Sequence, residues 1–146
     1  TAAAIGAHRV GIRLSPYGVF NSTGGFADVE VQYLALTQQL SDLGLLYLHV
    51  LDHSAMGAPA VPAELKSRLR AAFRGLFILA GGFDRTSAER ALQAGQADLI
   101  AFARPFLANP DLVARMQSDA ALNAVDAQTF YTPGAKGYTD YPALAA

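Results

Sequence analysis

The stretch Leu76-Phe-Ile-Leu-Ala80 is apolar at every position and continues directly into Gly81 and Gly82. A short apolar run that ends at a turn signal is typical of a strand buried on both faces. Three further runs are of similar length and mostly apolar, at 9–14, 45–51 and 98–103. Strands of this kind occur in parallel sheets covered by helices. Antiparallel strands with one solvent-exposed face instead alternate apolar and polar residues.

Helical patterns fill the intervals between these runs and the chain after the last one. Apolar spacing and capping signals predict helices over 28–43, 62–74, 86–94 and from Asn109 onward. Strands that alternate with helices indicate an α/β fold with a parallel sheet. Two architectures remain open at this point: a complete small doubly wound sheet, or half of a TIM (β/α)8 barrel, which needs about 250 residues when whole.

Three details of these helices are specific enough to be tested. The first helix is predicted to bury one face that carries Tyr33, Leu36, Leu40 and Leu43. The segment Thr86-Ser-Ala-Glu89 predicts a capping box at the start of the third helix. Asn109, which precedes a proline and an aspartate, predicts the N-cap of the fourth.

Composition and charge exclude several classes of protein. Of the 146 residues, 52% are hydrophobic and 16% are charged, which excludes a disordered tail. A net charge of −1 gives no electrostatic reason to expect a nucleic acid or an acidic membrane as partner. The chain has no cysteine, which excludes disulfides and thiolate metal sites. It shows neither a membrane-spanning run nor a signal-peptide pattern, and we expect a cytoplasmic protein.

Two motifs at strand ends suggest a phosphate site. Gly81 and Gly82 follow the third strand, where paired glycines allow backbone N–H groups to approach an anion closely. Arg104 follows the fourth strand, at the end where a guanidinium can grip phosphate with two hydrogen bonds. Each motif alone also fits a tight turn or a solvated arginine. Together they match the loops that bind phosphate in (β/α) barrels.

Arg13 is the third candidate, because it lies within an otherwise apolar strand. A charge there is unfavourable unless it is paired or faces a ligand. An ion pair with an acidic neighbour is therefore one interpretation. The other is a cation held against an anionic or electron-rich cofactor edge.

Other polar residues carry less weight. His8 is expected on the surface, His49 could point to the helix layer, and His53 could face a pocket. No second histidine stands at metal-binding spacing, so a zinc site is rejected. A serine hydrolase lacks support because the G-x-S-x-G elbow is absent.

Four motifs resemble the C-terminal half of the Old Yellow Enzyme family of FMN-dependent ene-reductases, in order and over almost the whole chain. They are Arg9-Val-Gly-Ile-Arg-Leu-Ser-Pro16, Ala80-Gly-Gly-Phe83, Asp98-Leu-Ile-Ala-Phe-Ala-Arg-Pro-Phe-Leu-Ala-Asn-Pro-Asp-Leu-Val113 and Gly137-Tyr-Thr-Asp-Tyr-Pro142. The resemblance implies that the four strands are the fifth to eighth of a (β/α)8 barrel. It also implies that 1–146 is half of one barrel domain, with 119–146 as an irregular tail near the active-site mouth.

The same resemblance assigns cofactor-binding roles. Arg13 matches the arginine at the pyrimidine edge of the flavin. Gly81 and Gly82 match backbone phosphate ligands, while Ala103 through its N–H and Arg104 through its guanidinium match the rest of the phosphate clamp. Tyr131 matches an aromatic residue near the dimethylbenzene edge of the flavin.

The catalytic residues of the family have no counterpart here. The histidine pair that binds the substrate carbonyl and the tyrosine that donates a proton are expected in the missing N-terminal half, and neither His49 nor His53 matches that pair. The resemblance thus implies a fragment of a split, nicked or permuted enzyme, completed by a separate N-terminal barrel half. With NAD(P)H as reductant, the assembled enzyme would reduce alkenes activated by a carbonyl or nitro group. A non-catalytic half-barrel scaffold and a different phosphate-binding barrel are the alternatives.

Overall fold

A computed structural model describes residues 1–20 and 23–144 of the chain. The chain divides into two compact units, Thr1–Ala101 and Phe102–Ala146. The first unit holds four strands: β1 (Gly11–Leu14), β2 (Tyr47–Leu51), β3 (Leu76–Ala80) and β4 (Leu99–Ala101). All four lie within the predicted apolar runs, so these predictions are confirmed, although β1, β2 and β4 are shorter than the runs that contain them.

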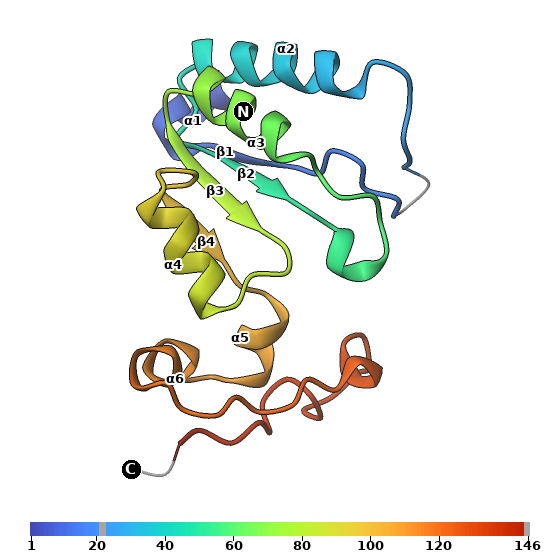
Figure 1. Ribbon diagram of the computed structural model, residues 1–146, viewed down its shortest axis with the longest axis vertical. Helices are drawn as coiled ribbons and strands as arrows, with labels where there is room; N and C mark the ends of the chain where they lie inside the picture. The colour runs from blue at the N-terminus through green and yellow to red at the C-terminus, as the bar shows by residue number, and fades with distance from the viewer. Residues whose placement is uncertain (21–22, 145–146) are drawn as a thin grey trace. The chain divides into compact units, whose positions relative to one another are not determined.

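The four strands form one parallel sheet in the order β1-β2-β3-β4 (Figure 1). Each strand therefore pairs with the next strand of the sequence. Because crossovers between parallel strands are right-handed, a sheet in sequential order receives all its connecting helices on one face. A doubly wound sheet instead reverses its order and carries helices on both faces. The observed order is that of a (β/α) barrel segment.

The connecting helices of the first unit are α2 (Val29–Asp42), α3 (Ala63–Ala72) and α4 (Arg85–Gln93). Figure 1 shows α2 and α3 side by side over the sheet. Two short helical segments precede β1: α1 (Ala2–Ile5) and the 3₁₀ helix η1 (Ala7–Arg9). A second 3₁₀ helix, η2 (Ser54–Met56), follows β2. None of the helices in the described residues combines the length and the apolar character that a bilayer crossing requires.

The core lies between the sheet and these helices. Alternate strand residues supply one side of it, and α3 supplies the other with Leu65 and Leu69, which are fully buried. The strand residues in this core that are at most 4% exposed are Leu48, Val50, Phe77 and Leu79. These side chains bury apolar area of the kind that dominates folding stability.

The predicted apolar face of α2 is partly wrong. Leu40 is buried and Tyr33 is half-buried, but Leu36 is 37% exposed and Leu43 is 60% exposed. The buried face instead includes Thr37, whose side chain is small enough to lie against the packed layer. Apolar spacing alone therefore overestimated how much of the helix faces the core.

The capping box of α4 begins two residues before the predicted one. The Asp84 carboxylate accepts a hydrogen bond from the backbone N–H of Ser87 at 2.7 Å, and the Ser87 hydroxyl accepts one from the N–H of Asp84 at 3.0 Å. Asp84 is a strong N-cap residue, and the pair satisfies two backbone donors reciprocally. Thr86 and Glu89 consequently lie inside the helix.

The second unit holds α5 (Arg104–Ala108), α6 (Leu112–Ser118) and the 3₁₀ helix η3 (Ala127–Thr129). Sequence patterns predicted no helix at α5. The N-cap of α6 is Asp111 rather than the predicted Asn109. Asn109 is fully buried and uses its side chain elsewhere: its amide nitrogen donates to the Pro105 carbonyl, and its amide oxygen accepts from the backbone of Asn123.

A buried arginine secures the tail within this second unit. Arg115, 4% exposed, donates to the Asp111 carboxylate at 2.7 Å and to the carbonyl oxygens of Ala121 and Pro142. A buried charge is tolerated when every donor has a partner. The tail, although mostly irregular, is therefore fixed within its own unit by specific hydrogen bonds.

Candidate functional site

The sheet face opposite the helices carries the candidate site. Because side chains alternate along a strand, the residues between the core positions must project from this open face. Ten strand residues do so: Gly11, Arg13, Tyr47, His49, Leu51, Leu76, Ile78, Ala80, Leu99 and Ala101. Arg13 is the one charged residue among them, so the open face is an apolar surface with a single cation.

Arg13 is exposed and has no acidic partner. Within 1–20 and 23–144 its guanidinium forms no ion pair and no hydrogen bond. The interpretation of Arg13 as half of an ion pair therefore has no support in the structure. An unpaired guanidinium on an apolar face is suited to an external anion or electron-rich ring.

His49 lies beside Arg13. The two residues are register partners on β1 and β2. The neighbouring residues Leu48 and Val50 are fully buried in the helix-side core, which directs His49 to the open face rather than toward the helices. Its Nε2 atom is buried and has no hydrogen-bond partner among the residues that the structure describes. Burial, and secondarily the charge of Arg13, lower the pKa of His49.

Gly81 and Gly82 form the turn that leaves β3. Both have positive φ, 112° and 69°, which L side chains rarely adopt. At Gly81 a Cβ atom would also overlap the backbone oxygen of Asp52. In the part of the chain that the structure describes, the N–H groups of Gly81 and Gly82 donate to no carbonyl or side chain. Two adjacent unsatisfied donors at a strand end are suited to an anion.

Asp52 braces this turn, a role that the sequence did not reveal. Its buried carboxylate accepts hydrogen bonds from the N–H groups of Ser54 and Val61 and from Lys66 Nζ, the last at 2.7 Å. Burial alone would raise the pKa of Asp52, but the hydrogen bonds from Lys66 and Ser54 lower the pKa below its usual value. An aspartate just after an apolar strand was the available signal, but its partners come from elsewhere in the chain.

His53 also follows β2 and lies against Phe20, with ring centroids 4.8 Å apart. Its Nδ1 atom is buried without a partner. The expectation that His8 is a surface residue is confirmed.

The second unit holds the remaining predicted residues. Ala103 and Arg104, both exposed, are the N-cap and first residue of α5, two and three positions beyond the end of β4. The Arg104 side chain has no partner among the described residues. Tyr131 is 94% exposed and contacts Phe130 edge-on, with centroids 6.4 Å apart. All three residues are thus accessible from solvent.

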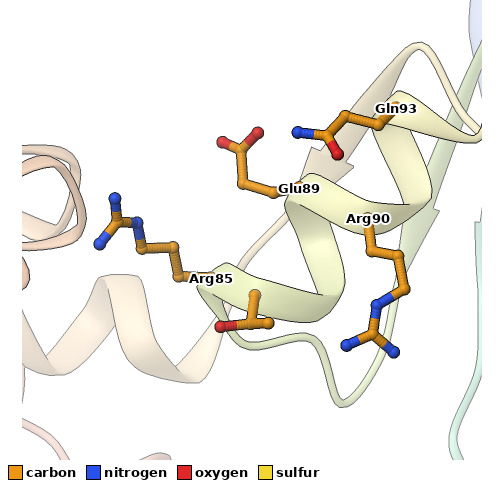
Figure 2. Close-up of a pocket in the computed structure, with 5 residues that line it drawn as sticks. Arg85, Glu89, Arg90 and Gln93 are labelled. Carbon is orange, nitrogen blue, oxygen red and sulfur yellow. The ribbon is translucent and has the colours of Figure 1, made fainter.

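The first unit also has a shallow hollow on α4. It is lined by Arg85, Thr86, Glu89, Arg90 and Gln93. In Figure 2, Arg85, Glu89 and Gln93 project from one side of the helix and Arg90 from the other. All five residues are exposed and belong to one helix, so they cannot enclose a ligand as a pocket between elements does.

Comparisons with known proteins identify relatives over almost the whole chain. The family model described as NADH:flavin oxidoreductase / NADH oxidase matches residues 2–123. The chain is 43% identical to 12-oxophytodienoate reductase 2 of Arabidopsis thaliana, over 96% of this chain and 38% of that protein. It is 42% identical to 12-oxophytodienoate reductase 1 of Oryza sativa subsp. japonica, over 97% of this chain and 38% of that protein.

Solved structures agree. Morphinone reductase matches with a TM-score of 0.88 and 39% identity, over 98% of this chain and 38% of that one. Morphinone reductase in complex with tetrahydroNAD matches with a TM-score of 0.87 and 38% identity, over 99% of this chain and 38% of that one. The chain therefore spans less than half the length of the relatives it matches.

Proposed function

Because the chain belongs to the NADH:flavin oxidoreductase / NADH oxidase family, we propose that it supplies the FMN phosphate site and one flavin edge of an Old Yellow Enzyme-type ene-reductase. The assembled enzyme would use NAD(P)H to reduce alkenes activated by a carbonyl or nitro group. Relatives named 12-oxophytodienoate reductase and morphinone reductase support a reductase. The observation that carries the proposal is the unpaired Arg13 on the open apolar face.

Arg13 fits the edge of a flavin ring. Reduction of the flavin adds negative charge to the ring, and a nearby guanidinium stabilises that charge and raises the reduction potential. The apolar neighbours on the open face provide a low-dielectric surface on which this interaction is strong. Arg13 would therefore bind the ring and favour its reduced form.

The phosphate of FMN would be held by groups from two strand ends. We assign the unsatisfied N–H groups of Gly81 and Gly82 as donors to phosphate oxygens. Ala103 would add its N–H, and Arg104 would add a charge-assisted bidentate contact. The donor groups that we assign to the phosphate on these four residues form no hydrogen bond with any other group in the described chain.

FMN, when bound, supplies the hydride chemistry that connects the nicotinamide to the alkene. The residues of this chain bind and orient the cofactor. The exposed ring of Tyr131 would cover the dimethylbenzene edge and limit the access of water. No residue of this chain is assigned the proton transfer to substrate, because we expect the residue for that step in the N-terminal half.

A complementary N-terminal half is the proposed partner. Leu76 and Leu99 on the open face are 43% and 49% exposed, and the sheet ends at the unpaired edges of β1 and β4. Exposed strand edges and apolar faces require cover in a stable protein. The first four strands of a barrel would pair with both edges and bury the leucines.

The test is to produce the chain together with a polypeptide that carries the first four strands of a family member, and to measure flavin absorbance after purification. We expect a yellow protein whose colour is bleached by NAD(P)H and restored by an activated alkene. A colourless assembly that takes up no added FMN would contradict the proposal. Colour that NAD(P)H never bleaches would instead support a non-catalytic scaffold.

The phosphate assignment can be tested separately with riboflavin, which lacks the phosphate. Arg104→Ala should weaken FMN binding about tenfold or more and leave riboflavin binding unchanged, because the guanidinium contacts only the phosphate. Arg90→Ala, which removes an exposed arginine of α4, is the matched control and should change neither affinity. Equal losses for FMN and riboflavin in Arg104→Ala would refute the assignment.

A further inference from the structure

Two polar side chains lie at the same level of the open face. Arg13 on β1 and His49 on β2 are register partners, and neighbouring parallel strands are about 4.8 Å apart. The alternation of both strands directs the two side chains to the same side. They are therefore adjacent, and they belong to elements whose relative position the sheet fixes.

The surroundings of this pair are apolar. On the other side of His49, its register partner on β3 is Ile78. The only other titratable residue that the strands place on this face is Tyr47, two residues before His49. No acidic side chain occurs in the four strands, so no strand residue of this face neutralises the charge of Arg13.

Both members of the pair have unused hydrogen-bonding capacity. The Nε2 atom of His49 is buried and has no partner in the described part of the chain. Buried polar atoms in native proteins are almost always hydrogen-bonded. The guanidinium of Arg13 is likewise unpaired in the described residues. Burial, and secondarily the charge of Arg13, lower the pKa of His49, which favours the neutral imidazole with its one acceptor nitrogen.

We propose that His49 is a positioning residue for Arg13, which its neutral ring steadies against the flavin without cancelling the positive charge. This inference rests on the proposed FMN site. A carboxylate at position 49 would hold the guanidinium but neutralise it, and an aliphatic side chain would leave it unsupported. A neutral acceptor gives both orientation and a net charge of +1 beside the ring, which favours reduced over oxidised flavin.

Three variants of the assembled FMN protein separate these effects. His49→Gln keeps a neutral acceptor. The dissociation constants for oxidised and reduced FMN should each stay within about twofold of the wild-type values, so the midpoint potential should change little. His49→Leu should weaken the binding of oxidised FMN about tenfold, because the guanidinium loses its support. His49→Glu should lower the affinity for reduced relative to oxidised FMN about tenfold, which for a two-electron couple lowers the midpoint potential by about 30 mV.

The measurements are FMN titration and spectroelectrochemistry, with thermal unfolding of each apoprotein as a folding check. His8→Gln, at an exposed histidine, is the matched control and should behave as the wild type. If His49→Leu fails to fold, the comparison of the Gln and Glu variants decides. Indistinguishable potentials for the wild type and the Gln and Glu variants would overturn this inference alone, whereas a wild type that never binds FMN would overturn the proposed function with it.

Discussion

The two faces of the sheet differ in their side chains and in how fully those side chains are buried. The helix-covered face buries Leu48, Val50 and Phe77 completely. The open face carries Arg13 and His49 among apolar residues, two of which remain largely exposed. Residues of the covered face and residues of the open face alternate along the same strands, so each strand contributes both to the core and to the candidate site.

This difference separates stability from function. The covered face is closed by helices of the same chain, and the strand side chains that it buries most deeply, Leu48, Val50, Phe77 and Leu79, are apolar and offer a ligand no polar atom. The open face has a cation and a ring nitrogen that find no partner in the described part of the chain, and Leu76 and Leu99 on it are exposed. Substitutions on the covered face should therefore affect folding, while substitutions on the open face should affect binding.

Phe77→Ala should have the largest effect, a loss of about 4 kcal/mol in the free energy of unfolding, because a fully buried ring leaves a cavity. Urea denaturation followed by circular dichroism measures it. Leu76→Ala, one residue away on the open face and 43% exposed, should cost less than about 1 kcal/mol in the uncomplexed chain. Equal losses for the two variants would remove the distinction between the faces.

Gly81→Ala should come next, with a loss of about 3 kcal/mol, since the new methyl group would overlap the Asp52 backbone at a φ of 112°. The same variant should fail to retain FMN. Gly24→Ala is the control, because no atom lies within 4 Å of its added Cβ. A Gly81→Ala protein as stable as Gly24→Ala would mean that the turn after β3 is not held against Asp52.

Arg13→Ala should raise the Kd for FMN about a hundredfold, equivalent to about 2.7 kcal/mol, because the charge at the flavin edge is lost. Its free energy of unfolding should stay within about 0.5 kcal/mol of the wild type, since the side chain has no partner in the described chain. Fluorescence quenching of FMN and urea denaturation give the two numbers. Lost stability with retained FMN affinity would reverse the roles of the faces.

Lys66→Met should have the smallest effect, about 1 kcal/mol at neutral pH, because Lys66 is partly exposed although it binds the buried Asp52. This ion pair joins α3 on the covered face to the loop beside Gly81. The pKa of Asp52 is lowered on folding, so its stabilisation is complete above the ordinary value of 3.8 and is lost as the pH falls through the lower folded value. Unfolding curves at several pH values should show a weaker acid dependence in Lys66→Met, and an unchanged dependence would show that Lys66 does not set it.

The covered face was predictable because local sequence determines it. Apolar runs at 45–51 and 76–80 and the helix at 62–74 follow from periodicity, and the structure confirms them. Periodicity also marked Leu36 and Leu43 as buried, which is wrong, because it reports which residues share a face and not how wide the covered stripe is.

The open face could be predicted only in part. Arg13 stood out because a charge interrupts an apolar strand, and Gly81 with Gly82 stood out because paired glycines follow one. Asp52 and His49 did not stand out in the sequence, because their environments depend on residues far along the chain, such as Lys66 and Arg13. The short helix α5 was missed because its five residues carry too few periodic positions to register.

The central claim is that FMN lies on the open face and at the adjoining strand ends. Its most direct test is an FMN titration of the assembled protein in which only this chain carries ¹⁵N, followed by NMR. We predict that the amide signals of Gly81, Gly82, Ala103 and Arg104 and the side-chain Nε signal of Arg13 shift together, with one common Kd. Shifts confined to Arg85, Glu89 and Arg90 on the outer surface of α4, or no shifts at all, would contradict it.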